Sequence, residues 1–297
     1  MAWEIIISQT EGSKRLENFL KKRFPIGYVR KLFRKSGIRL NGKRLGPDAI
    51  VQPGDRITLF IPFEERSTVA EKQAPAQTEF EILFEDDDLL VVNKHAGIAV
   101  HEGKETLRHH SLLGMLEARY RPQATIPRLV HRIDKETSGL LVVAKREDVA
   151  RDLENKFKEG GVKKEYLALV VGRLYPKEGR IDFRLPGRDS RPVSALTRYR
   201  VEKEFPETTL ARVNIGTGRM HQIRLHFAQL GHPVVMDREH GDFAFNKHFR
   251  RTHGLKRQFL HARAITFDYQ GKTREWTAPL SDDLVQTLKS LECFSYS

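Results

Sequence analysis

The chain has 297 residues, enough for about two domains of roughly 150 residues each, and 39% hydrophobic residues exclude disorder throughout. Its single cysteine, Cys293, excludes an internal disulfide and any zinc site built from several cysteines. The formal net charge of +13, from 52 Lys and Arg against 39 Asp and Glu, is typical of a protein that binds a polyanion, with nucleic acid as the first candidate.

The N-terminal stretch MAWEIIISQT lacks a basic region and carries Glu4 within its apolar residues, so we expect no signal peptide. Elsewhere, no apolar run approaches the roughly 18 residues of a membrane helix. These features favour a cytoplasmic protein that does not cross a membrane.

The next segment is strongly basic: residues 13–44 hold twelve Lys and Arg and one acidic residue. Apolar residues at helical spacing predict a short helix near residues 16–20 and a second from Gly27 to about Lys35. The pair Asn41-Gly42 between two short apolar pieces predicts a hairpin, and a strand is expected after the turn at residues 53–55.

This segment resembles the S4 RNA-binding domain through RLENFL, YVRKLFRKSGIRLNGKRL and IVQPGDRI. The resemblance implies an S4-like RNA-binding domain over residues 1–65, with basic side chains on one face that neutralise phosphates. The candidate RNA-binding residues here are Arg30, Lys31, Arg34, Lys35, Lys43 and Arg44. The alternative is a solvated basic face without a partner.

Residues 66–78 are poor in large apolar side chains and read as a linker, followed by a second domain over residues 79–297. Strands and helices do not alternate regularly there, so we expect an α+β fold with a mixed, largely antiparallel sheet. The expected elements are strands on either side of the acidic turn 86–88, helices at 111–120, 147–158 and 220–230, and strands at 139–145, 165–174 and 259–280, the last with a turn at Gln270-Gly271.

The string HRIDKETSGLLVVAK, residues 131–145, places Asp134 in a polar loop before an apolar strand. A carboxylate beside an apolar wall can act as a nucleophile or a base, but Asp134 taken alone also fits a turn or cap residue. His131 suggests a metal pair, yet no further cluster has strong metal-ligand spacing. We therefore expect no metal.

The same string resembles the HRLDxxTSGLL signature of the RluA family of pseudouridine synthases. Further strings resemble that family's motifs in the same order: FEDDDLLVVNKHAGIAVH, KKEYLALVVG, TGRMHQIRLHFAQLGHPVVMD and RQFLHA. With the S4-like segment, the resemblance covers nearly the whole chain. It is strongest to the RluC branch, which acts on large-subunit ribosomal RNA.

The chain departs from the family's usual pattern at His95, where Pro is usual, and at His240, where Tyr is usual. Neither position is the family's catalytic one. The departures therefore imply a change in loop rigidity or RNA contact rather than a loss of activity.

The resemblance implies isomerisation of uridine: the N1–C1′ bond breaks, the base rotates and a C5–C1′ bond forms. No group is oxidised or passed to another molecule, so no cofactor is expected. Asp134 is the implied catalytic residue; whether it adds to the sugar, adds to the base or removes the 2′ proton stays open. Tyr166 would stack on uracil and handle the C5 proton, and Arg224 would pair with Asp134.

Other residues have implied supporting roles. Arg132 would fill the gap left by the target nucleotide, and Arg219 and His221 would contact phosphate or serve the structure. His131, Thr137 and Ser138 are expected to shape the loop rather than do chemistry.

The expected partner is RNA, specifically large-subunit ribosomal RNA or an assembly intermediate, bound by a monomer. Transfer RNA is the alternative substrate. A catalytically idle RNA-binding or ribosome-assembly factor and a metal-dependent RNA hydrolase are the alternative classes.

Overall fold

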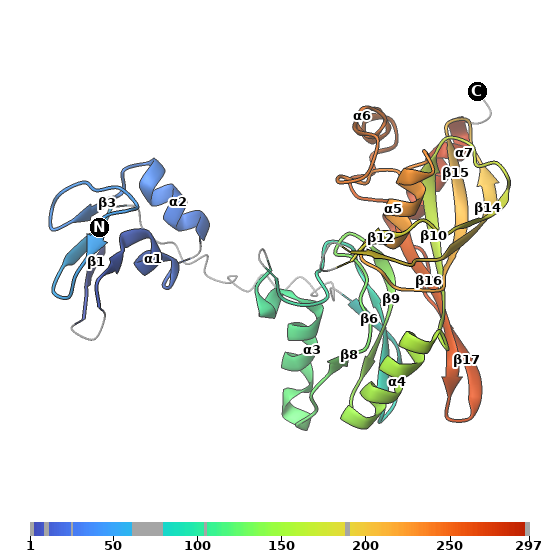
Figure 1. Cartoon of the computed structure of the whole chain (residues 1–297), viewed down its shortest axis with the longest axis horizontal. Coiled ribbons are helices and arrows are strands. Elements are labelled where there is room, and N and C mark those ends of the chain that lie inside the picture. The colour runs from blue at the N-terminus through green and yellow to red at the C-terminus, as the bar shows by residue number, and fades with distance from the viewer. Residues whose placement is uncertain are drawn as a thin grey trace. The chain divides into compact units, whose positions relative to one another are not determined.

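A computed structural model describes residues 3–8, 12–24, 26–60, 80–103, 106–187 and 191–294. The chain forms two compact units, Met1–Ala76 and Gln77–Ser297, drawn in Figure 1. The predicted linker, 66–78, lies outside the described residues. The limits 1–65 and 79–297 therefore stay predictions, as does the S4 assignment.

The N-terminal unit joins a small antiparallel sheet, in the order β1-β5-β3, to two helices. Its elements are β1 (Trp3–Ile6), β2 (Lys14–Arg15), α1 (Leu16–Lys21), α2 (Ile26–Arg34), β3 (Ile38–Leu40), β4 (Ile50–Val51) and β5 (Arg56–Leu59). Phe19 and Leu20 of α1, Leu32 of α2 and Ile57 of β5 are fully buried in one core. The helical spacing of these apolar residues therefore positions both helices, as predicted.

The predicted hairpin at Asn41-Gly42 is confirmed as a tight turn, but its pairing stops after one residue on each side. Both residues adopt positive φ, and a single bridge joins Leu40 to Lys43, but no strand follows. Instead β3 pairs with the distant β5. Asn41 explains this choice, because its side chain bonds the Asp55 carboxylate and the backbone N–H of Arg56 and so ties the turn to β5.

The C-terminal unit is built on a ten-stranded sheet with the main order β11-β14-β15-β10-β16-β9-β7-β6, to which β17 and β8 add beside β16 and β9. All its pairings are antiparallel except that of β9 with β16. The strands are β6 (Phe80–Glu85), β7 (Leu89–Lys94), β8 (Arg128–Leu129), β9 (Ser138–Ala144), β10 (Lys163–Val171), β11 (Glu178–Ile181), β14 (Thr197–Glu204), β15 (Thr208–Ile215), β16 (Leu260–Tyr269) and β17 (Lys272–Thr277), with β12 (Leu185–Pro186) and β13 (Pro192–Val193) in a separate pair. The predicted α+β class with a mixed, largely antiparallel sheet is confirmed.

Helices cover both faces of this sheet. Successive strand residues point to opposite sides, so one strand can contribute to a core on each face. The helices are α3 (Leu112–Tyr120), α4 (Glu147–Glu159), α5 (Gln222–Gln229), α6 (Phe243–His253) and α7 (Asp282–Phe294), with short 3₁₀ turns η1 (Arg108–His110) and η2 (Arg121–Gln123). Helices α3 and α5 share one core with Tyr166 and Ala168 of β10, whereas α6 and α7 pack with Leu167 and Leu169 of that strand. Figure 1 shows α5, α6 and α7 toward one end of the unit and α3 and α4 toward the other. None of the helices described combines the length and apolar character needed to cross a membrane.

Helices α6 and α7 were not predicted, although each carries a readable signal. The Asp242 side chain accepts the backbone N–H of Phe245, and Gly254 ends α6 with a left-handed φ of 76°. In α7, Leu284, Leu288 and Leu291 follow helical spacing and enter one core. The turn expected at Gln270-Gly271 is confirmed between β16 and β17.

One close approach fixes the strand that follows Asp134. Gly139 has φ 106°, and a Cβ atom built there would lie 2.2 Å from the carbonyl oxygen of Ala262. The side-chain-free position therefore lets β9 lie parallel to β16, where His261 pairs with Ser138 and Ala262 with Gly139.

We predict that Gly139→Ala lowers the free energy of unfolding by about 2–4 kcal/mol, because it adds a backbone clash to an unfavourable φ. The matched control is Gly271→Ala, which has φ 75° but open space around its Cβ position. Urea denaturation at pH 7 should give a loss of about 1–2 kcal/mol for the control. Equal losses of unfolding free energy in the two variants would show that the contact between the new Cβ atom and the Ala262 carbonyl oxygen does not destabilise the fold.

Candidate active site

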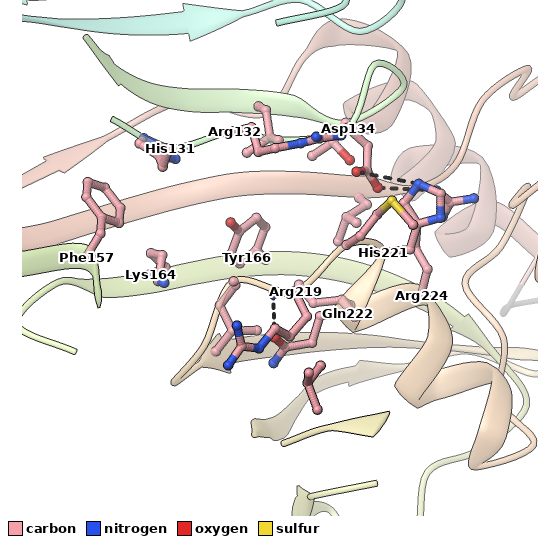
Figure 2. A pocket seen from close by; sticks show the side chains of 18 of the residues that line it. His131, Arg132, Asp134, Phe157, Lys164, Tyr166, Arg219, His221, Gln222 and Arg224 are labelled. Atoms are coloured by element: carbon pink, nitrogen blue, oxygen red, sulfur yellow. Dashed lines mark hydrogen bonds and ion pairs between the residues drawn. The ribbon is translucent and has the colours of Figure 1, made fainter. Parts of the chain in front are cut away.

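A cleft of about 620 Å³ lies in the C-terminal unit and is lined by residues 130–134, Lys164, Tyr166 and residues 218–224. This volume suits a bound nucleoside-sized group. Figure 2 shows Phe157, Lys164 and Tyr166 along the cleft, with Asp134 and Arg224 facing each other beyond them. The loop before β9, strand β10 and helix α5 thus bring together residues distant in sequence, such as Asp134 and Arg224, which are 90 positions apart.

The loop that carries Asp134 is held from behind by Lys94. This side chain is fully buried, and its Nζ donates to the carbonyl oxygens of His95, Ile98 and Lys135 at 2.9, 3.0 and 3.1 Å. Burial lowers the pKa of Lys94 to about 7, and repulsion from Arg257 adds to the effect. Three carbonyls receive all three ammonium donors, which fixes the backbone next to Asp134.

The other side of the loop is held by β16 and the segment before it. Arg257 donates to the carbonyl oxygen of Glu136 and to Ser138 Oγ, and is itself held by a bidentate pair with Asp283. His261 Nδ1 lies 2.9 Å from the same Ser138 oxygen. These contacts explain how the RQFLHA segment contributes to the site although it lies far along the chain.

His131 makes contacts with the strand and the helix beside this loop. Its Nε2 accepts the backbone N–H of Val142 at 2.8 Å, and its ring stacks on Phe157 with centroids 4.5 Å apart. Burial lowers the pKa of His131 to about 3, with a contribution from Lys164. The ring is therefore neutral at pH 7, as an acceptor must be.

Arg224 connects Asp134 to two further carboxylates. Its Nη1 lies 3.2 Å from Asp134 Oδ2, and its Nε and Nη2 grip Asp237 at 2.6 and 2.8 Å. Nη2 also lies 2.9 Å from Glu239 Oε2. Side-chain exposure is 6% for Arg224 and 20% for Asp134, so the guanidinium is enclosed while the carboxylate still opens to the cleft.

Asp237 is the buried partner in this network. Burial alone would raise its pKa, but the hydrogen bonds from Arg224 and from the backbone N–H groups of Glu239 and His240 bring the pKa of Asp237 below its ordinary value. These contacts shape the turn 237–240. The opposing carboxylates in turn raise the pKa of Arg224 above its ordinary value despite its burial.

The first residues of α5 are held in place by contacts just N-terminal to Arg224. His221 adopts a left-handed φ of 52°, and α5 begins one residue later at Gln222. The predicted helix 220–230 is therefore wrong at its start, because the exposed Met220 lies before α5. The buried Gln222 accepts from Thr217 and from the backbone N–H of Arg219, and donates to the carbonyl oxygen of Leu196. His221 Nε2 lies 3.9 Å from Asp134 Oδ1, and its pKa is lowered, mainly by burial.

Tyr166 stands in the middle of the cleft wall, on β10 between β15 and β16, with 7% of the residue exposed. Burial raises the pKa of Tyr166 well above its ordinary value, and the Asp134 carboxylate adds to the effect. The hydroxyl therefore stays protonated at neutral pH.

All six cleft residues singled out in the sequence line this one cavity: Arg132, Asp134, Tyr166, Arg219, His221 and Arg224. The six candidate RNA-binding residues of the N-terminal unit are all exposed: Arg30, Lys31 and Arg34 on α2, Lys35 directly after it, and Lys43 and Arg44 after the turn at Asn41-Gly42. The sequence reading missed the supporting roles of Lys94, Asp237 and Arg257. It also missed Lys164, a cleft lysine whose pKa burial lowers.

The fold and the cleft match one class of RNA-modifying enzyme. The family described as RNA pseudouridylate synthase matches residues 88–229. The Ribosomal large subunit pseudouridine synthase C of Haemophilus ducreyi is 36% identical over 96% of this chain and 94% of its own. Its namesake in Escherichia coli K12 is 33% identical over 97% of this chain and 96% of its own.

A solved structure agrees: human RNA Pseudouridylate Synthase Domain Containing 4 aligns with a TM-score of 0.61 and 25% identity, over 71% of this chain and 92% of that one. The chain belongs to the RNA pseudouridylate synthase family, and it is an RNA pseudouridine synthase. The resemblance drawn from the sequence motifs is confirmed.

We predict that Arg224→Met lowers the free energy of unfolding by about 3–5 kcal/mol, because it leaves the Asp237 carboxylate, 1% exposed, buried without its partner. A lowered carboxyl pKa stabilises the fold above the unfolded-state value near 4 and loses that effect as the pH falls through the folded-state pKa. The gap between wild type and variant should therefore shrink on acidification.

The matched control is Arg212→Met, which breaks the partly exposed pair with Glu202 and should cost at most about 1 kcal/mol. Urea denaturation between pH 3 and pH 7 measures both. A pH-independent gap for Arg224→Met would contradict the proposed pairing with Asp237.

Proposed function

We propose that this enzyme isomerises uridines in large-subunit ribosomal RNA, with Asp134 as the catalytic residue. The observation that carries the proposal is the Asp134 carboxylate, which opens to the cleft while Arg224 holds its other side at 3.2 Å. The hydrogen bond from the guanidinium fixes the orientation of this carboxylate, and a carboxylate can serve as nucleophile or base.

Tyr166 is proposed to bind the base. Its ring lies on the cleft wall with Asp134, and its protonated hydroxyl offers a donor to a uracil oxygen. The raised pKa argues against a phenolate that waits for the C5 proton. This refines the sequence-based role, in which the hydroxyl handled that proton directly.

The uridine must leave its stack to reach Asp134, because the carboxylate lies within a cleft rather than on an open surface. Arg132 is exposed at this cleft, and we propose that its planar guanidinium fills the vacated position. Arg219 is exposed at the same cleft and Lys164 lies in its wall, so both add positive charge where a phosphate backbone would pass.

The ribosomal substrate is supported by the relatives, which carry large-subunit names and match 96–97% of this chain. That coverage includes the N-terminal unit, in which Arg30, Lys31 and Arg34 of α2 and the adjoining Lys35 are exposed to solvent. A basic helix of this kind suits backbone contacts to a large structured RNA. Transfer RNA remains the comparison substrate.

We predict that wild-type protein releases tritium from ribosomal RNA labelled at uridine C5, without added divalent metal, and does so faster than from transfer RNA. Asp134→Asn should abolish release while RNA affinity stays nearly unchanged, because the amide keeps the shape but is neither nucleophile nor base. Glu136→Gln, a change of the same kind in the same loop, should retain turnover.

Other results would assign other functions. Tritium release by Asp134→Asn would remove Asp134 from the catalytic role. Strand scission in place of release would indicate a hydrolase, and RNA binding with neither reaction would indicate a binding factor.

We predict that changing Arg30, Lys31, Arg34 and Lys35 together to Gln flattens the plot of log affinity against log salt by about three units, at roughly 0.7–0.9 for each phosphate contact. The charge-matched control changes four exposed basic residues outside the cleft: Lys177, Arg200, Lys272 and Lys289. Fluorescence anisotropy on a ribosomal RNA fragment measures both slopes. Equal slopes in the two variants would show that α2 is only a solvated face.

A further inference from the structure

Beside the catalytic carboxylate, three side chains aim ligand atoms at one point. His221 Nδ1 lies 3.2 Å from Glu239 Oε2 and 3.2 Å from His240 Nε2, and His240 Nε2 lies 3.7 Å from Glu239 Oε2. Two imidazoles and one carboxylate therefore form a triangle that could hold a metal ion. His240 is the position at which the sequence departs from the Tyr usual in the family.

The size of this triangle fits one particular coordination. A tetrahedral Zn²⁺ ion at about 2.0–2.2 Å from each ligand separates the ligand atoms by roughly 3.3–3.6 Å. The three measured edges lie within about 0.1 Å of that range. Two histidines and a glutamate would fill three positions and leave the fourth open toward solvent.

The triangle is built on a rigid support. The Asp237 carboxylate accepts the backbone N–H groups of Glu239 and His240 at 2.9 and 3.1 Å. Asn246 of α6 donates to the Asp237 carbonyl oxygen and accepts the N–H of Met236. The ligand-bearing turn is thus shaped before any ion binds, which lowers the cost of binding.

The local charge also favours a cation. Arg224 is the guanidinium shared by the carboxylates of Asp134, Asp237 and Glu239, so the formal charges of this cluster leave two negative charges uncompensated. A divalent ion would balance them. His221 would also place its second nitrogen toward Asp134, at 3.9 Å, in the carboxylate–histidine–metal order that supports metal ligands.

We propose that His221, Glu239 and His240 bind one divalent transition-metal ion of the Zn²⁺ type and that its binding closes the catalytic cleft. The ion competes with Arg224 for the Glu239 carboxylate and fixes His221 against Asp134, where the uridine must enter. The site is a regulatory one, so the isomerisation itself proceeds without it.

Full-length protein titrated with ZnCl₂ in a non-chelating buffer should bind one ion at this site by calorimetry, and Co²⁺ should give the visible absorption of a four-coordinate N/O site. His240→Tyr should weaken Zn²⁺ binding by about 100-fold or more, since even loss of a supporting contact costs roughly 10–100-fold. The control His109→Ala/His110→Ala removes two exposed, neighbouring histidines outside the site and should leave this binding intact.

Only the activity measurement depends on the proposed function; the metal-binding measurements do not. Zn²⁺ should suppress tritium release by wild type and by the His109/His110 control, while His240→Tyr keeps its metal-free rate with or without Zn²⁺. Equal Zn²⁺ affinity in wild type and His240→Tyr, or an unchanged Co²⁺ spectrum, would overturn the site. Zn²⁺ binding at the site without suppression would overturn the closure. A protein that binds Zn²⁺ as expected but releases no tritium under any condition would instead count against the proposed function.

Discussion

The Arg224 guanidinium is the constraint on which the site depends. It binds Asp134 from the loop before β9 and Asp237 and Glu239 from the turn after α5. One planar group with five fixed donors can hold three carboxylates at once and bind one of them through two parallel hydrogen bonds, a geometry that lysine lacks. The position of the candidate catalytic carboxylate is thereby coupled to the packing of α5 and of the 237–240 turn.

The second requirement is a stiff loop around Asp134. Lys94 holds the Lys135 carbonyl, Arg257 holds the Glu136 carbonyl, and Gln258 donates to Thr137 Oγ1. Because these partners belong to β7 and to the segment entering β16, the sheet itself sets the loop. Chemistry that moves a base between two bonds at C1′ needs this order, since small displacements of a reacting group cost large factors in rate.

The sequence predicted the parts of the site that sit inside dense motifs. The resemblance to the family's motifs singled out Asp134, Tyr166 and Arg224, and the structure brings all three to one cleft. The hairpin at Asn41-Gly42 extends no further than the Leu40–Lys43 pair, because a turn signal fixes the turn but not the partner strand, which the Asn41 contact to Arg56 selects. Helices α6 and α7 could have been predicted from helix-capping residues and from the helical spacing of apolar residues.

The features that the sequence could not predict are buried contacts between residues distant in the chain. Nothing local marks Lys94 as a donor to a carbonyl 41 residues away, or Arg257 as a support for residues near 136, because such contacts exist only once the sheet is assembled. The triangle of His221, Glu239 and His240 is of the same kind: its three residues span 19 positions, and only the left-handed backbone at His221 and the turn at Asp237 bring them together.

The most direct test of the account is a structure of the Asp134→Asn variant bound to an RNA fragment that the wild-type enzyme modifies. The account predicts the target uridine out of its stack, its base against the Tyr166 ring and its C1′ atom about 3–3.5 Å from the side chain at position 134. A uridine bound elsewhere, or held with its C1′ atom turned away from position 134, would contradict it.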